Sequence, residues 1–406
     1  MSTDTAGPVR VAEEDLVAFA RAVNRHFHES EEDDDVLPWV EAFTTGYRAW
    51  WTRVDGRVAG NLGIIETSVS VPGGAHLPVA AVTAVGVAQT MRRRGLLRAL
   101  MVAALDEAVE RGEPVAALFA SEAGIYGRFG FGAAVPHVSY RIERGRVRFR
   151  DPVDVRQVVA TDPAAARQAW PTIHAAMRSV RGGSVARHPG LWDLSIIQDP
   201  PGWRGGASAR RLVEVPGRGY AAYRVLDSSD GLLATGTLQL LELVATDPDA
   251  EAALWQHVLD VDLTATVEAA LRPVDDALPH LVSDAYVLRA AVAEPLFLRV
   301  LDTPRTLTAR RYAASGRVVL EVVDDLGHAG GRWALEVDAG GAACEPTEAP
   351  AALRLPVESL SAVVLGGVTT STLLAARRAE ELREGAAVEL DRLLAVDRSP
   401  WTTSIF

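Results

Sequence analysis

The sequence contains no lysine, so arginine supplies all 41 of its strong bases. It has a single cysteine, Cys344, which excludes an internal disulfide and a cysteine-based metal cluster. Its histidines, aspartates and glutamates show no spacing that is typical of metal ligands. These absences predict a protein that holds no metal. They also favour a reducing compartment, and we expect the protein to be cytoplasmic.

Long apolar segments and an excess of positive charge are missing too. Residues 1–11 lack the apolar core of a secretion signal, and no uncharged stretch is long enough to span a bilayer. The formal net charge is −12, which argues against a nucleic-acid-binding protein, because such proteins carry basic patches or stripes. A negative field of this kind favours the approach of cationic substrates, and the alternative interpretation is that the charge serves solubility alone.

The first segment predicts a mixed α/β sheet. The chain has 406 residues, 48% of them apolar, which suits two to four domains with buried cores. A meander of strands followed by alternating strands and helices predicts a sheet with helices on its faces. The expected elements are helices at 11–28 and 92–111 and strands at 47–54, 58–71, 79–87, 115–120 and 135–142.

A second segment repeats this order, and a third does not. The repeat predicts a degenerate copy of the first domain. We therefore predict tandem α/β domains at 1–146 and 147–299 and a different α/β domain at 300–406. The expected later elements are strands at 212–215, 220–225, 235–246, 317–323 and 331–337 and helices at 164–180, 249–258, 371–387 and 389–394.

The most informative stretch joins the buried strand ending at Val87 to the following helix. Arg92–Arg94 and Gly95 occupy the joint. Three arginines are unfavourable at the positive end of a helix dipole unless an anion neutralises them. Free N–H groups, a glycine that permits close approach and three positive charges suit a pyrophosphate. The alternative interpretation is an ordinary basic helix start.

The predicted second copy differs at this joint. Its helix starts with Asp247, Asp249 and Glu251, which suit the helix dipole and would repel phosphate. We therefore expect only the first copy to bind a phosphate-bearing cofactor.

A family resemblance accounts for these features. The strand followed by Arg92-x-x-Gly95 resembles motif A of the GNAT acetyltransferases, although Leu97 stands where that family usually has a small residue. The run at 92–97, the Ser121-to-Gly132 segment and the terminal aromatic residue resemble the enhanced intracellular survival (Eis) acetyltransferases. This resemblance covers essentially the whole chain.

The resemblance implies two GNAT-type domains followed by a sterol-carrier-like domain, assembled as a homohexamer. It implies acetyl transfer from acetyl-CoA to amines of aminoglycoside-like substrates. The alternatives are acetylation of protein or peptide lysines or of polyamines, or a lipid-carrier module with a vestigial enzyme site. The predicted cofactor-binding residues are Val85, Gly86, Val87, Arg92, Arg93, Arg94, Gly95, Leu96 and Ser121.

Acetyl transfer to an amine needs a proton acceptor, a proton donor and oxyanion stabilisation. The resemblance makes Tyr126 the general acid; its alternative role is packing beside Phe129. It also makes the α-carboxylate of Phe406 the base, with simple docking of an apolar tail as the alternative. Glu122 and His137 are weaker candidates for the base. A backbone N–H from 85–87 would stabilise the oxyanion, and the sequence does not choose among the three.

The acceptor side of the site is less defined. His26 and His28 either line the substrate mouth with the acidic run 29–35 or form a solvated edge. Aromatic residues form either a wall for a cationic sugar or part of the core. They are Trp39, Phe43, Trp50 and Trp51.

Overall fold

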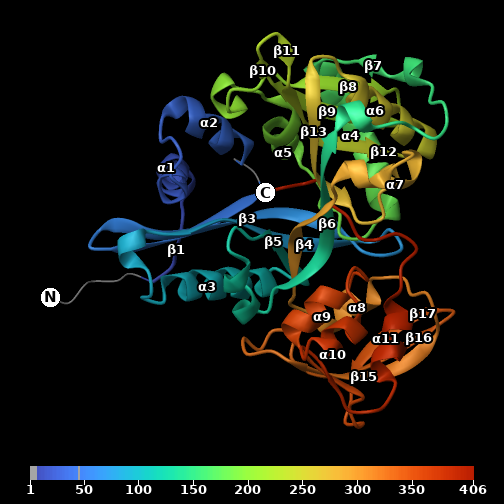
Figure 1. Ribbon diagram of the computed structural model, residues 1–406. Coiled ribbons are helices and arrows are strands. Elements are labelled where there is room, and N and C mark those ends of the chain that lie inside the picture. Colours follow the sequence, from blue (N-terminus) through green and yellow to red (C-terminus); the bar gives the residue numbers. More distant parts are fainter. Residues whose placement is uncertain (1–6, 44–45) are drawn as a thin grey trace.

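The computed structural model describes residues 7–43 and 46–406. Residues 1–6, part of the stretch that predicts no secretion signal, lie outside the described residues. The described chain forms three sheets, two large ones and the two-stranded β10-β11 (Figure 1). The larger has twelve strands in the order β1-β2-β3-β4-β5-β14-β6-β13-β12-β9-β8-β7, and a separate sheet has five in the order β17-β16-β15-β18-β19.

The N-terminal region contains a strand–helix–strand unit, β4–α3–β5. The helix α3 crosses over so that β4 and β5 run parallel. The elements of this region are β1 (Val9–Arg10), α1 (Leu16–Phe27), α2 (Asp33–Ala42), β2 (Tyr47–Val54), β3 (Arg57–Ser70), β4 (His76–Val87), α3 (Leu96–Glu110), β5 (Val115–Phe119) and β6 (Gly132–Glu143).

The middle region contains a second unit of the same kind, β12–α6–β13, again with parallel strands. Asp247 is the N-cap residue of α6, and its side chain accepts a hydrogen bond from the Ala250 N–H. The elements are β7 (Val159–Ala160), α4 (Pro163–Val180), α5 (Pro189–Trp192), β8 (Arg211–Val215), β9 (Gly219–Leu226), β10 (Ser229–Asp230), β11 (Leu233–Ala234), β12 (Gly236–Ala245), α6 (Pro248–Asp260), β13 (Thr264–Pro273) and α7 (Leu278–Leu281).

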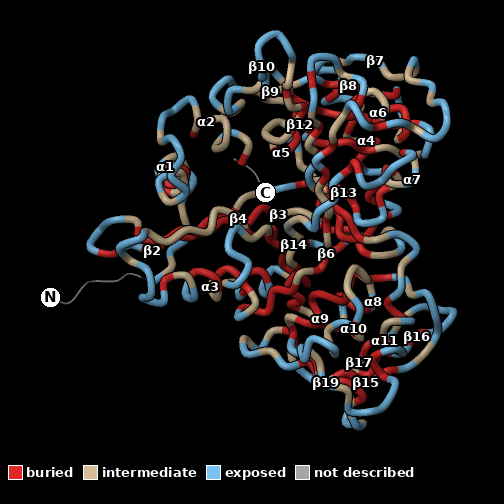
Figure 2. The backbone as a smooth tube through the Cα atoms, in the orientation of Figure 1, coloured by how far each residue is buried: buried red, intermediate tan, exposed pale blue. Residues whose placement is uncertain are grey.

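One long-range insertion joins these regions into a continuous sheet. Strand β14 (Ala291–Val300) lies between β5 and β6 and pairs antiparallel with both. Strand β6 in turn pairs with β13, so the sheet passes without interruption from the first unit to the second. Buried segments follow this line of strands through the centre of the molecule (Figure 2).

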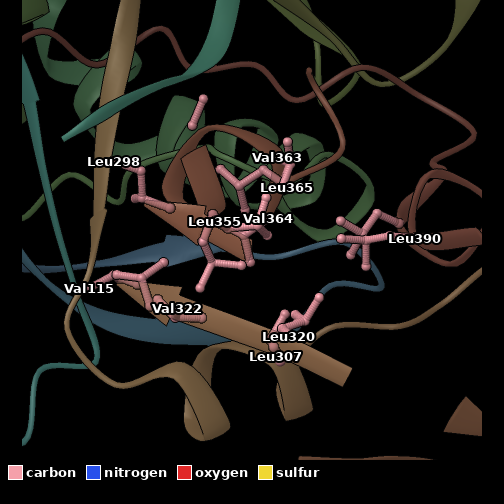
Figure 3. Packing of buried hydrophobic residues seen from close by; sticks show 14 of the residues in the cluster. Val115, Leu298, Leu307, Leu320, Val322, Leu355, Val363, Val364, Leu365 and Leu390 are labelled. Carbon is pink, nitrogen blue, oxygen red and sulfur yellow. The ribbon is translucent and has the colours of Figure 1, made fainter. Parts of the chain in front are cut away.

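The C-terminal domain packs against this sheet through one apolar core. Val115 of β5 and Leu298 of β14 share a buried cluster with Leu320 and Leu355 of the smaller sheet (Figure 3). Cys344 is buried in the same cluster, where burial raises the pKa of its thiol to about 12. The elements are α8 (Thr303–Thr308), β15 (Gly316–Val323), β16 (Gly331–Asp338), β17 (Gly341–Pro346), β18 (Leu353–Pro356), α9 (Val357–Val363), α10 (Thr370–Ala375), β19 (Glu380–Glu381) and α11 (Ala386–Leu394).

Three predicted helices have different bounds. The helix expected at 11–28 begins only at Leu16, after a 3-10 turn at Glu13–Asp15. The expected helix at 371–387 is wrong as one element, because α10 ends at Ala375, Arg377 turns left-handed at φ 59°, and β19 pairs with β18. The helix expected from Arg92 begins at Leu96 instead, because Gly95 adopts φ 80° and places the arginines in the preceding loop.

Candidate active site

The first parallel strand pair comes apart part-way along its length. Strands β4 and β5 pair from Val79–Val115 to Ala81–Ala117. Beyond this point β4 continues to Val87 paired only with β3, and β5 continues to Phe119 paired with β14. We call this place the first divergence. It leaves one edge of β4 at 83–87 without a strand partner, available to the amide groups of an extended ligand.

A β-bulge shapes the free end of β4. Ala84 and Val85 face the single residue Leu62 of β3, and Ala84 adopts φ 51°. The side chain of Asn61 donates from Nδ2 to the Ala84 carbonyl at 2.5 Å and accepts from His26 Nδ1 on α1. This chain of contacts holds the bulge and gives His26 a structural role, whereas His28 is exposed.

The loop before α3 presents positive charge at a helix start without a cap. Arg92–Arg94 and Gly95 are all exposed, and no acidic side chain lies in the first turn of α3. A Cβ on Gly95 would meet no atom within 4 Å, so the space beside it is open. The side chain of Arg92 lies 3.7 Å from that of Glu122, and both are about half exposed, so the contact is weak.

Tyr126 lies in the loop after β5, between two short 3-10 turns. It is 8% exposed and its ring packs edge-on against Phe131, 6.2 Å away. Burial, with a smaller contribution from the Glu122 carboxylate, raises the pKa of its phenol. No described residue hydrogen-bonds to its hydroxyl. The phenol is therefore protonated at neutral pH and its proton is available to a ligand.

The C-terminus reaches the first divergence from the opposite face of the sheet. In Figure 1 the chain end lies between α2 and the strands of the N-terminal region, away from the C-terminal domain. The Phe406 ring packs edge-on against Phe119 at 5.8 Å and joins the cluster that contains Ala81. Side chains alternate between faces along a strand. Ala80 and Leu118 accordingly face the cluster of Tyr126 on the α3 side.

Some of the predicted site residues meet at the divergence of β4 and β5, and others lie away from it. Tyr126 and Phe406 approach the divergence of β4 and β5 from the two faces of the sheet. Ser121 and Glu122 are exposed on the loop beyond β5, and His137 is buried below the tail, where its Nε2 donates to the Thr402 carbonyl at 3.1 Å. Val85, Gly86 and Val87 lie at the end of β4, and Leu96 begins α3 with a side chain that is 5% exposed.

Aromatic rings gather beside the chain end. Trp39 contacts Phe43 at 4.8 Å and Tyr47 at 5.2 Å between ring centroids, and all three belong to or pack on the cluster that Phe406 joins. Trp50 and Trp51 are buried in the core. Of the predicted aromatic wall, only the part beside α2 lies near the chain end.

Asn61 is the residue of this site that sequence reasoning missed. The signal was present, because Asn61 is the one polar side chain in the apolar run 58–65 and glycines at 60 and 63 lie close to it. The anchors of the tail, Arg187 and Glu242, gave no such signal, since they contact residues more than 150 positions away along the chain.

Comparison with known proteins agrees with this geometry. Residues 9–134 and again 183–300 match the acetyltransferase (GNAT) domain family, and residues 303–403 match the sterol carrier protein domain family. The chain is 42% identical over 364 residues to an uncharacterized N-acetyltransferase of Streptomyces coelicolor, covering 86% of this chain and 87% of that protein.

Two further relatives decide the family. The chain is 34% identical over 342 residues to the N-acetyltransferase Eis of Mycobacterium tuberculosis, which covers 82% of each protein. The crystal structure of Eis1 from Mycobacterium abscessus matches 100% of both chains with a TM-score of 0.84 and 32% identity. The chain belongs to the Eis family of GNAT acetyltransferases. This Eis-family protein is thus an N-acetyltransferase with two GNAT domains and a sterol-carrier-like domain, which confirms the predicted family, fold class and enzyme type.

GNAT acetyltransferases use acetyl-CoA and an acceptor substrate. Within 7–43 and 46–406 of this Eis-family chain, no group of three or more histidine, cysteine, aspartate or glutamate side chains is arranged to hold a metal ion. No helix in the same residues has both the length and the apolar character needed to cross a membrane.

Proposed function

We propose that this Eis-family enzyme transfers the acetyl group of acetyl-CoA to an amine of a polycationic, aminoglycoside-like acceptor. The observation that carries the proposal is that Tyr126 and the chain end Phe406 approach one divergence of β4 and β5 from opposite faces. A donor bound on the α3 side and an acceptor bound on the α2 side would meet there.

The coenzyme fits the α3 side of the site. Acetyl-CoA supplies a thioester and an anionic diphosphate. The exposed Arg92–Arg94 loop and the uncapped helix start at Gly95 suit the diphosphate, and the open space beside Gly95 lets it approach the backbone. The unpaired edge of β4 at 85–87 suits the amides of the pantetheine arm and supplies N–H donors for the oxyanion. Leu96 and Ser121 complete the predicted contacts.

Two groups of this chain handle protons in the proposal. Tyr126 donates its phenolic proton to the departing thiolate, a role that suits its raised pKa and its unpaired hydroxyl. The α-carboxylate of Phe406 accepts the proton of the acceptor amine. An ordinary α-carboxyl has a pKa of about 3.5. The Phe406 side chain is partly buried beside aromatic rings, and desolvation of its carboxylate there would strengthen it as a base.

The acceptor side supports a cationic substrate. Trp39 offers an aromatic face, and the acidic residues at 33–35 lie in the first turn of α2. The continuous core that Val115 shares with Leu320 gives the C-terminal domain a packing role, which favours the enzyme over a lipid carrier. We further propose domain boundaries at 1–146, 147–299 and 300–406. We also propose a homohexamer, whose molar mass light scattering would measure.

One assay tests the proposal. The purified enzyme is incubated with acetyl-CoA and one class of amine at a time: kanamycin-like aminosugars, polyamines or lysine-containing peptides. The release of free thiol is followed in each reaction. We expect release with the aminosugars. Release with peptides or polyamines alone would mean that these amines, and not aminosugars, are the acceptors. No release with any amine would contradict the enzyme assignment at this site. Reactions without acceptor measure background hydrolysis.

A further inference from the structure

The middle domain contains a second divergence, and it is filled. Strands β12 and β13 pair in parallel from Gly236–Thr264 to Leu240–Ala269, and then each continues beside a different partner. This repeats the arrangement of β4 and β5. The cavity left there measures about 10 Å³, no more than one water requires. Its lining residues are Leu240, Leu241, Glu242, Leu243, Ala270, Leu271, Arg272, Trp401 and Thr403.

The occupant is the C-terminal segment of the same chain. Trp401 donates from Nε1 to the Leu271 carbonyl of β13 at 2.6 Å. On the other side, Thr403 donates from Oγ1 to Glu242 Oε1 of β12 at 2.9 Å. The segment therefore bridges the two diverging strands. Arg272 and Arg181 place their guanidinium groups 5.2 and 5.7 Å from the Trp401 ring, which adds cation–π attraction.

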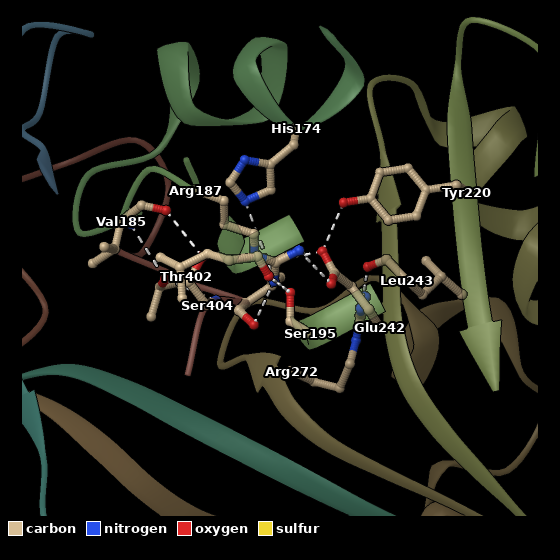
Figure 4. A network of polar contacts seen from close by, with 12 residues as sticks. His174, Val185, Arg187, Ser195, Tyr220, Glu242, Leu243, Arg272, Thr402 and Ser404 are labelled. Atoms are coloured by element: carbon tan, nitrogen blue, oxygen red, sulfur yellow. Dashed lines mark hydrogen bonds and ion pairs between the residues drawn. The ribbon is translucent and has the colours of Figure 1, made fainter. Parts of the chain in front are cut away.

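A buried ion pair holds the last residues in place. Arg187 and Glu242 lie 2.8 Å apart with side chains only 2% exposed. Arg187 also donates to the Thr403 carbonyl at 2.8 Å and to Ser404 Oγ at 3.0 Å (Figure 4). Tyr220 donates to Glu242 Oε1 at 2.7 Å, the oxygen that also accepts from Thr403, while Arg187 contacts Oε2. Two buried charges need such partners, so the network admits few other tail positions.

We propose that the second divergence is a socket for the C-terminal segment, and that Arg187, Glu242 and Thr403 are positioning residues that set the place of the Phe406 carboxylate. This inference rests on the proposed role of that carboxylate as the base. It gives the degenerate GNAT domain a task in the reaction. The gap between its strands β12 and β13 holds the C-terminal segment, which would otherwise be mobile, in one position.

The charge of the middle domain supports this occupant over a coenzyme. The helix α6 starts with Asp247 and Asp249, and Asp247 already caps it. A diphosphate would therefore meet negative charge and no free N–H at that helix start. A neutral peptide segment with hydroxyl and indole donors suits the opening left between β12 and β13.

The test compares three threonine variants in the full chain. Thr403→Val removes the hydroxyl that donates to Glu242 but keeps the size, Thr403→Ser keeps the hydroxyl, and Thr264→Val is the matched control. The Thr264 hydroxyl donates to the Val261 carbonyl in the same domain, away from the tail. We expect Thr403→Val to lower kcat about tenfold or more, with the KM for acetyl-CoA unchanged, because a misplaced reacting group slows the chemistry. Thr403→Ser and Thr264→Val should keep kcat.

Amide hydrogen exchange gives a readout independent of activity. Thr403→Val should speed exchange in the tail at 401–406 and at 241–244 and 270–272 of the two strands that it bridges, and not in the rest of the chain. Equal kcat in Thr403→Val and Thr403→Ser, or unchanged exchange in these segments, would overturn the socket. A glycine added after Phe406 tests the base separately. Full turnover in that extended chain would remove the carboxylate from the mechanism, while the exchange result would still decide on the socket.

Discussion

The two GNAT domains of this chain share one framework and differ at two places. Both contain a parallel strand pair joined by a helix and separating beyond its middle, at β4–β5 and at β12–β13. In the first, arginines precede an uncapped helix and the space beside Gly95 is open. In the second, Asp247 caps the helix, and Trp401 and Thr403 of the C-terminal segment fill the divergence. The two domains therefore differ in the charge at the start of the helix and in whether the strand divergence is open or filled, while their framework is the same.

The difference has a stability component. An aspartate cap contributes about 1 kcal/mol to a helix, and α6 gains that contribution from Asp247. The start of α3 forgoes it, since no side chain caps Gly95. Its free N–H groups are then available to an anion. A local loss of stability at α3 is what a binding site at that helix start would require.

The largest expected effect is on Tyr126, the proposed proton donor of the first domain. Tyr126→Phe removes the phenolic proton and keeps the ring packed against Phe131, so we expect kcat to fall roughly 10²–10⁴-fold. The Kd for acetyl-CoA should stay nearly unchanged, as measured by calorimetry. The matched control is Tyr140→Phe, a buried tyrosine whose ring packs on Trp255 in the middle domain. Loss of coenzyme binding in Tyr126→Phe, with kcat retained at saturation, would contradict its role as the acid.

A smaller effect should follow from reversing the helix-start charge. Arg93→Glu with Arg94→Glu puts negative charge where the coenzyme phosphates are proposed to bind. We expect the KM for acetyl-CoA to rise about ten- to a hundredfold, and the remaining affinity to lose its normal salt dependence. Steady-state kinetics at two ionic strengths measure both quantities.

The reciprocal change in the second domain is the control for this prediction. Asp249→Arg makes the start of α6 less acidic, but the tail still occupies the divergence of β12 and β13. The KM and the number of coenzyme sites should therefore stay the same. A second coenzyme site in this variant would mean that charge alone, without an open divergence, suffices for binding.

Local patterns in the sequence predicted most of this framework. The apolar run at 79–87, the arginine turn and the acidic start at Asp247 each depend on a few neighbouring residues, and the strand and the two helices begin within four residues of where they were expected. Even the error at α3 was local, because the left-handed Gly95 moved the helix start past the arginines.

Long-range pairing was beyond reach of such patterns. The insertion of β14 between β5 and β6 depends on contacts across more than 150 residues. The contact of His137 with Thr402 spans 265 positions. The sequence around His137 or Thr402 gives no pattern that identifies the other residue as its partner. The position of the chain end was therefore predicted from family resemblance alone. The socket in the middle domain was not predicted at all.

The smallest effect is expected at the cap of α6 and sharpens the stability side of the comparison. A side-chain hydrogen bond from Arg218 is the main cause that lowers the pKa of Asp247. A carboxyl with a lowered folded pKa adds stability above its unfolded pKa of about 3.9. That stability is lost as the pH falls through the folded pKa. Asp247→Asn keeps a capping oxygen but loses the charge, so the α6 amides should open more readily at pH 7.

The size and the pH dependence of this change are both checkable. Because the pair is partly exposed, we expect at most about 1 kcal/mol at pH 7, measured by hydrogen exchange of the first turn of α6. The gap between the aspartate and asparagine chains should close as the pH falls below 4. If the difference in opening free energy between the two chains instead grew in acid, the Asp247 charge would destabilise the start of α6. Charge would then not explain why α6 is capped while the start of α3 is left free for an anion.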